Sequence, residues 1–133
     1  MEAKQLADVV LTAALEKKAI DPAILAVADL VGYADYFVIV SGRNPRQVRA
    51  IASEVRQHLK HQHDILPVGM EGQETGKWVL LDYGDVVLHV FQEGARAFYD
   101  LDGLWADAPR LPLPEGVVLP PTDDLDVPSF SLP

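Results

Sequence analysis

The clearest pattern of hydrophobic and polar positions lies between Lys77 and Phe91. Two runs rich in β-branched and aromatic residues flank Asp82-Tyr83-Gly84-Asp85, which is typical of a β-hairpin. With Tyr83-Gly84 as a two-residue turn, Asp82 lies opposite Asp85 and Trp78 lies opposite His89. Successive side chains point to opposite faces of such a hairpin. One face is wholly aliphatic and is expected to enter the core: Val79, Leu81, Val86, Leu88 and Val90.

The other face of the hairpin mixes aromatic, aliphatic and ionisable side chains, namely Trp78, Leu80, Asp82, Asp85, Val87, His89 and Phe91. An aromatic anchor among aliphatic residues, with carboxylates at one side, is typical of a surface that binds a partner. The alternative is that helices or a loop cover this face as well. Periodicity alone does not decide between these two interpretations.

The rest of the pattern predicts helices over residues 2–18, 44–61 and 94–102, and strands over residues 23–28, 36–40 and 66–70. Pro67 places the last of these strands at an edge of the sheet or makes it the start of a strand. The resulting order is α-β-β-α-β-β-β-α. It predicts a single α/β (α+β) domain, in which helices pack on a five-stranded mixed sheet.

The strongest local signal is the start of the second helix. Asn44 is suited to the N-cap, Pro45 to the first helical position, and Gln47 returns a hydrogen bond to the cap. The spacing predicts that Val48, Ile51, Ala52, Val55 and Leu59 are buried. It also turns four cations toward water, where we expect them only to be solvated: Arg46, Arg49, Arg56 and Lys60.

The amino-acid composition limits the possible chemistry, location and partners of the protein. The chain has 133 residues, which is enough for one domain with a core of its own, and it has no cysteine, which excludes thiolate catalysis and disulfide scaffolds. No apolar run approaches 18 residues, and the N-terminus lacks the pattern of a signal peptide. We therefore expect a cytoplasmic protein with no membrane association. The formal net charge of −9 disfavours nucleic acid as the main partner and favours a basic protein.

The C-terminal residues 107–133 differ in composition from the rest of the chain. They hold seven of the ten prolines and five acids against one base, Arg110. Because this segment lacks helical or strand periodicity, we expect it to be an extended or disordered tail beyond a domain comprising residues 1–106. A chain that ends at Ala106 should then melt within a few degrees of the full chain.

Candidate chemistry is sparse. Asp82, Asp85 and His89 have acceptable types of metal ligand, although acidic residues at a hairpin tip are usually turn formers. Three histidines near the end of the second helix, His58, His61 and His63, lack the spacing of a known zinc motif. The turn at Ser41-Gly42-Arg43 matches a phosphate loop only loosely, because it has one glycine and no Lys-Ser/Thr pair.

Several separate motifs resemble one family in a collinear order over roughly residues 5 to 105. They are residues 34–42 (ADYFVIVSG), 47–52 (QVRAIA), Glu71-Gly72, Trp78, 82–91 (DYGDVVLHVF), 96–101 (RAFYDL) and Leu104-Trp105. This set is similar to the Iojap-related ribosomal silencing factor family, RsfS. The resemblance implies a nucleotidyltransferase-like α/β fold without an established catalytic activity, and no cofactor is expected. It also implies binding to the large ribosomal subunit through large-subunit ribosomal protein fourteen, which hinders joining of the small subunit and so represses translation.

The resemblance and the hairpin pattern together suggest a docking surface. Trp78, Leu80 and Val87 would form its desolvated centre, and Glu71, Asp82 and Asp85 would face basic groups at the rim, with His89 on the same strand face. Ribosomal RNA would be at most a peripheral contact. Two other hypotheses remain: a divergent metal-dependent nucleotidyl- or phosphoryl-transferring enzyme that uses Asp82, Asp85 and His89, and a protein that is monomeric on the ribosome but homodimeric through the Trp78 face when free.

Overall fold

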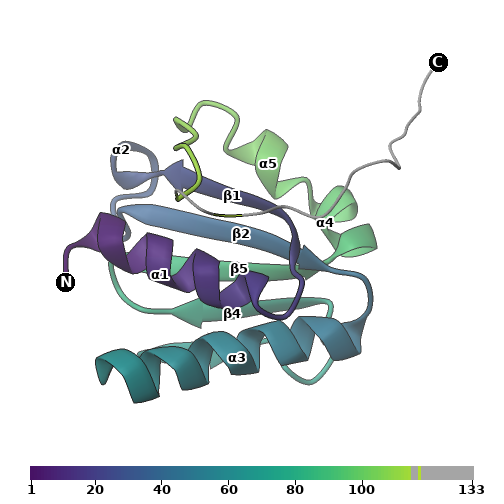
Figure 1. The fold of residues 1–133 in the computed structure, drawn as a ribbon. Coiled ribbons are helices and arrows are strands. Elements are labelled where there is room, and N and C mark those ends of the chain that lie inside the picture. Colours follow the sequence, from purple (N-terminus) through teal and green to yellow (C-terminus); the bar gives the residue numbers. More distant parts are fainter. Residues whose placement is uncertain (115–116, 118–133) are drawn as a thin grey trace.

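The computed structural model describes residues 1–114 and 117, and its centre is a five-stranded mixed sheet with helical layers (Figure 1). The strands lie in the order β1 (Ile20–Ala26), β2 (Tyr36–Gly42), β5 (Val86–Gln92), β4 (Trp78–Asp82) and β3 (Gly69–Glu71). β2 and β5 run parallel in the middle of the sheet, and the other neighbouring strands are antiparallel. The predicted fold class is therefore confirmed. β3 is an edge strand, but it begins at Gly69 instead of residue 66, so Pro67 precedes the strand.

Two long helices, α1 (Ala3–Leu15) and α3 (Pro45–His63), cover one face of the sheet. The other face carries α4 (Glu93–Tyr99) and α5 (Leu101–Leu104), and the short α2 (Ala28–Val31) packs beside it through Val31. Each face of the sheet has its own hydrophobic cluster, because alternate residues of the central strands point in opposite directions. Within the described residues no helix is both long and apolar enough to cross a membrane.

Helix α3 begins as its sequence predicts, since the Asn44 side chain accepts a hydrogen bond from the Gln47 amide at 2.9 Å. The Gln47 side chain accepts from the Arg43 amide, one residue before the expected partner, and its Nε2 donates to the carbonyls of Lys17 and Lys18. This glutamine therefore ties the start of α3 to the turn after α1. The five residues predicted to be buried on α3 all have fully buried side chains.

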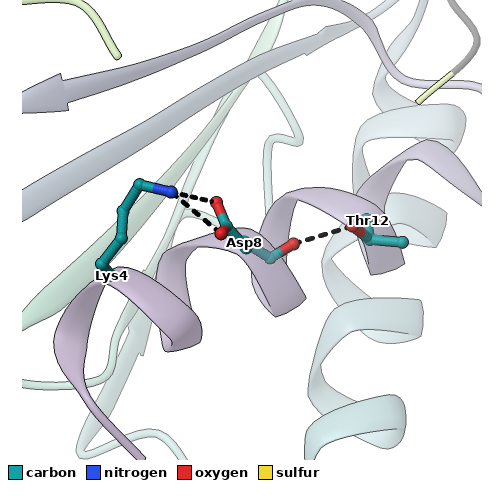
Figure 2. Close-up of polar contacts among 3 residues, drawn as sticks. All are labelled: Lys4, Asp8 and Thr12. Carbon is teal, nitrogen blue, oxygen red and sulfur yellow. Dashed lines mark hydrogen bonds and ion pairs between the residues drawn. The ribbon is translucent and has the colours of Figure 1, made fainter. Parts of the chain in front are cut away.

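Helix α1 ends at Leu15, earlier than residue 18, because the chain passes through a turn in which Lys18 has a φ of 62°. Figure 2 shows the polar side of this helix. Lys4 forms an ion pair with Asp8 at 2.9 Å, and the Thr12 hydroxyl donates to the Asp8 carbonyl at 2.8 Å. The opposite side of α1 packs against α3 and the sheet.

The hairpin of β4 and β5 has a register two residues away from the predicted one. Trp78 lies opposite Phe91, and Asp82 lies opposite Val87. The turn is Gly84-Asp85, because Tyr83 donates to the Val86 carbonyl and Gly84 has a φ of 87°. A two-residue hairpin turn needs a positive φ at its first central position, and glycine meets that need without the strain that tyrosine would suffer. A shift of two residues leaves every side chain on its predicted face.

Three other details differ from the sequence prediction. The first strand runs from Ile20 to Ala26, and the residues that follow it form α2, where a loop was expected. The C-terminal helix is split into α4 and α5, because Asp100 adopts a left-handed conformation with a φ of 50°. Its side chain then accepts a hydrogen bond from the Gly103 amide.

The chain beyond Ala106 packs on the edge of the sheet as far as it is described. The Ala26 amide donates to the Pro109 carbonyl, and the Leu111 amide donates to the Ile24 carbonyl, each at 2.9 Å. Ala108 is buried, and Leu111 and Leu113 pack against the larger cluster. The domain boundary expected near Ala106 therefore falls inside the packed part of the chain. The expectation of an extended or disordered tail also covers residues 115–116 and 118–133, which lie outside the described residues.

Candidate partner-binding surface

An exposed group of aromatic and aliphatic side chains lies where β4 meets α4. The Trp78 and Tyr99 rings are 5.1 Å apart between centroids, and the Tyr99 and Phe98 rings are 5.2 Å apart. Phe98 is 81% exposed and Tyr99 is 51% exposed, whereas Trp78 and Leu80 are half-buried. We call Trp78, Leu80, Phe98 and Tyr99 the aromatic surface. Exposed aromatic side chains that contact one another are the usual anchors of protein interfaces.

The Trp78 side chain is fixed by two residues of the neighbouring strand β5. Its ring stacks on Phe91 with 4.8 Å between centroids, and its Nε1 donates to His89 Nδ1 at 3.1 Å. Burial lowers the pKa of His89 to about 4, so the imidazole is neutral near pH 7 and its Nδ1 can accept this hydrogen bond. Because Trp78 is fixed before a partner arrives, little side-chain entropy is lost on binding.

Two of the predicted contact residues do not reach the surface. Val87 and His89 are each only 4% exposed, and they pack in the second cluster with Phe37. The interpretation in which other elements cover this strand face therefore holds for these two residues, and they are removed from the predicted surface. The covering residues include Trp105 and Ala108, which follow α5.

The remaining predicted residues stay accessible. Asp82 is half-buried beside Leu80, whereas Glu71 and Asp85 are exposed. Glu71 lies opposite Leu80 in the ladder of β3 and β4. Glu71 and Asp82 thus lie on the outer strands β3 and β4, whereas Asp85 lies in the hairpin turn, at the opposite end of β4 from Trp78.

A shallow pocket of about 240 Å³ adjoins the aromatic surface and is lined by Glu71, Gly72, Trp78 and Leu80. Gly72 has a φ of 90°, and a β-carbon at this position would collide with the Trp78 carbonyl oxygen. Glycine is therefore required where the β3–β4 loop passes so close to β4. Trp78 and Leu80 give this pocket an apolar wall, and Glu71 gives it a negative end.

The proposed metal ligands are not assembled in the structure. Asp82 Oδ1 accepts a hydrogen bond from the Gly84 amide at 2.8 Å, which is the ordinary role of an aspartate before a turn. His89 is buried and its Nδ1 already has a donor. Residues 1–114 and 117 contain no group of three or more potential metal ligands. The Asp82, Asp85 and His89 constellation that the enzyme hypothesis needs is therefore not formed.

Sequence reasoning did not assign Phe98 and Tyr99 to the surface, although a signal was present. Adjacent residues on a helix point about 100° apart, so a short amphipathic helix seldom buries two consecutive large aromatic side chains. Applied to the sequence, this rule would have placed at least one of the pair in solvent, and both are exposed in the structure.

Comparison with known proteins gives a consistent result. A family model described as "Ribosomal silencing factor during starvation" (RsfS) matches residues 1–128. The ribosomal silencing factor RsfS of Halalkalibacterium halodurans is 40% identical over 118 residues, which cover 89% of this chain and 99% of that protein. A crystal structure of a Chromobacterium violaceum protein superimposes with a TM-score of 0.76 at 35% identity, and the match covers 80% of this chain and 88% of that one.

A more distant relative comes from mouse and is named "Mitochondrial assembly of ribosomal large subunit protein 1". It is 31% identical over 101 residues, which cover 74% of this chain and 44% of the mouse protein. The match to the family model continues beyond residue 105, where the resemblance found in the sequence ended, and includes the segment that packs on β1.

Proposed function

Because the chain belongs to the RsfS family of ribosomal silencing factors, we propose that it binds the large ribosomal subunit through large-subunit ribosomal protein fourteen and thereby prevents the small subunit from joining. The name of the mouse relative, which refers to assembly of the large ribosomal subunit, supports the choice of this subunit. In this proposal the protein represses translation by binding alone.

The observation that carries the proposal is the aromatic surface with its adjacent carboxylates. Trp78, Phe98 and Tyr99 supply large, partly preorganised contact areas, Glu71 and Asp82 supply negative charge on the outer strands, and Asp85 adds charge at the hairpin turn. Ribosomal proteins are generally basic, so the carboxylates of this surface are complementary in charge to a basic protein partner. The pocket beside Glu71 can accept a basic side chain of the partner, whose aliphatic part would lie against Trp78 and Leu80.

The proposed mechanism is steric. A folded domain bound at the interface side of the large subunit occupies volume that the small subunit needs, and no bond is made or broken. The strength of repression then depends on how much of the large subunit carries the protein. A homodimer of the free protein through the same surface would compete with this binding, because both would bury Trp78.

The test is a comparison of two exposed aromatic residues. Phe98→Ala should weaken binding to purified large subunits about 30-fold, the loss expected for a hot-spot residue that contributes about 2 kcal/mol. Tyr33→Ala is the matched control, since Tyr33 is 67% exposed but lies in the loop after α2, away from the aromatic surface. It should leave the affinity unchanged. Sedimentation with the subunits measures both variants.

The partner protein is tested separately with purified large-subunit ribosomal protein fourteen. The wild-type chain should bind it, and Phe98→Ala should reduce that binding by a similar factor. Equal binding by the wild type and Phe98→Ala would contradict the assignment of this surface. Binding to large subunits without binding to the isolated protein would contradict the choice of partner.

A further inference from the structure

Helix α3 carries an unusual share of the positive charge of this acidic chain. Helix α3 has four Lys or Arg residues and one acid, Glu54, whereas the rest of the chain has seven Lys or Arg residues against nineteen acids. Helix α3 is therefore net positive in a chain whose formal net charge is −9.

The cations of α3 form a stripe. Arg46, Arg49, Arg56 and Lys60 are all exposed, and their spacings of three, seven and four residues place them on the same side of the helix. With a rise of 1.5 Å per residue, the stripe is about 21 Å long. Glu54 lies on a different side of the helix. We call these four residues the basic stripe.

The basic stripe is not neutralised by the described part of the protein. None of its four residues forms an ion pair with a carboxylate of residues 1–114 or 117, where Lys4 and Asp8 do form one. Arg49 is held by backbone carbonyls instead, since its Nε donates to Gln73 at 2.7 Å and its Nη2 donates to Glu74 at 2.8 Å. The positive charge of the stripe therefore remains available to an external anion.

The basic stripe lies next to the proposed docking surface. The loop that Arg49 holds, between β3 and β4, begins at Gly72, which lines the pocket beside Trp78. The N-terminal part of the stripe is thus separated from that pocket by the width of one loop. A partner that presents basic protein beside a polyanion would meet complementary charge on both sides of this loop.

We propose that the basic stripe of α3 binds the phosphate backbone of ribosomal RNA beside the protein contact made by the aromatic surface. The choice of RNA rests on the proposed function, because RNA is the abundant polyanion next to a protein on the large subunit. A rigid row of Arg and Lys can follow successive phosphates along a strand and read no sequence. The acidic remainder of the chain weakens binding to RNA alone, so the stripe binds free RNA only at low salt and contributes most when the aromatic surface is docked.

The test is the salt dependence of binding to purified large ribosomal subunits. Each phosphate contact contributes about 0.7 to 0.9 to the slope of log affinity against log salt. The double variant Arg56→Gln/Lys60→Gln should therefore lower that slope by about 1.5. The control Lys4→Gln/Lys18→Gln removes the same charge from residues outside α3 and should leave the slope unchanged. Thermal melting checks that all variants are folded.

The outcomes separate this inference from the proposed function. An equal slope for the stripe variant and the wild type would overturn the stripe assignment while leaving subunit binding intact. A wild-type chain that does not bind subunits at all would refute the proposed function. In that case retention of purified large-subunit RNA on a filter at low salt decides the matter: loss of retention in the stripe variant supports the inference, and no retention by the wild type overturns it.

Discussion

At the scale of single residues, His89 is a buried imidazole that holds the main anchor of the proposed surface. Its ring lies between Phe37 and Trp78, and its Nδ1 accepts the hydrogen bond of the Trp78 indole. Protonation would remove this acceptor and place a charge in an apolar cluster. Burial accordingly lowers the pKa of His89 from 6.5 to about 4.

This pKa predicts how stability depends on pH. An unfolded chain binds a proton at His89 near pH 6.5, whereas the folded chain does so only near pH 4, so the free energy of unfolding should fall as the pH drops through this range. The full loss from this residue is on the order of 3 kcal/mol. It should be visible in urea melts recorded between pH 7 and pH 4.

The matched variants are His89→Gln and His61→Gln. Glutamine at position 89 has no titrating group, so this variant should lose less stability between pH 7 and pH 4 than the wild type, whatever its stability at pH 7. His61 is exposed on α3, and its replacement should leave the acid dependence unchanged. If the wild type and His89→Gln lose equal stability on acidification, the neutral buried state of His89 is wrong.

At the scale of elements, the segment after α5 behaves as part of the sheet. It makes two backbone hydrogen bonds to β1, buries Ala108, and places Leu111 and Leu113 against the larger cluster. It therefore covers a strand edge that would otherwise be open to pairing with other chains. Trp105 and Ala108 also cover the strand face that carries Val87 and His89.

Removal of this segment should destabilise the domain. A chain that ends at Ala106 loses the hydrogen bonds and the apolar burial, which together contribute about 3 kcal/mol. For a domain of this size the melting temperature should fall by about 10 °C. A chain that ends at Pro114 retains these contacts and is the control. Equal melting of the two truncated chains would show that the segment adds nothing to stability.

The segments with strong local signals were predicted well from the sequence. Asn44 and Pro45 define the start of α3 through hydrogen bonding and a fixed φ, and the apolar spacing gave its buried side correctly. The hairpin faces were also correct, since they depend only on alternation along each strand. Its register was wrong because two turns differing by one position both contain Gly84, and only the φ requirement separates them.

Features that depend on distant parts of the chain were not predictable in the same way. Val87 and His89 are buried because residues after α5 pack across their strand face. The sequence around Val87 and His89 gives no sign that this later segment covers them. The prediction that residues after Ala106 form an unpacked tail was wrong for the same reason. Pro109 and Leu111 pair with β1 through backbone groups, and such pairing needs no hydrophobic periodicity in the sequence. Phe98 joins the proposed surface only once α4 is placed beside β4.

At the scale of the whole molecule, a negatively charged surface lies next to a positively charged one. Carboxylates accompany the aromatic surface on the outer strands, and the basic stripe runs along α3 on the other side of the β3–β4 loop. The proposed function needs no more than this arrangement, because a bound domain blocks the small subunit by its volume. Its effect must then follow occupancy of the large subunit.

Occupancy gives the last prediction. In mixtures of purified subunits, the protein should raise the fraction of free subunits in step with saturation of the large subunit, without added nucleotide or metal. Reversal of charge at Asp82 and Asp85 should shift this curve to higher concentration, because rim charges guide encounter and orientation. The shift should shrink as salt rises, since the Debye length falls to roughly 3 Å at 1 M. Light scattering of the mixtures measures the curve.

Inhibition well below one copy per large subunit, or a requirement for nucleotide, would mean that the protein acts catalytically, because a steric blocker cannot affect more subunits than it occupies.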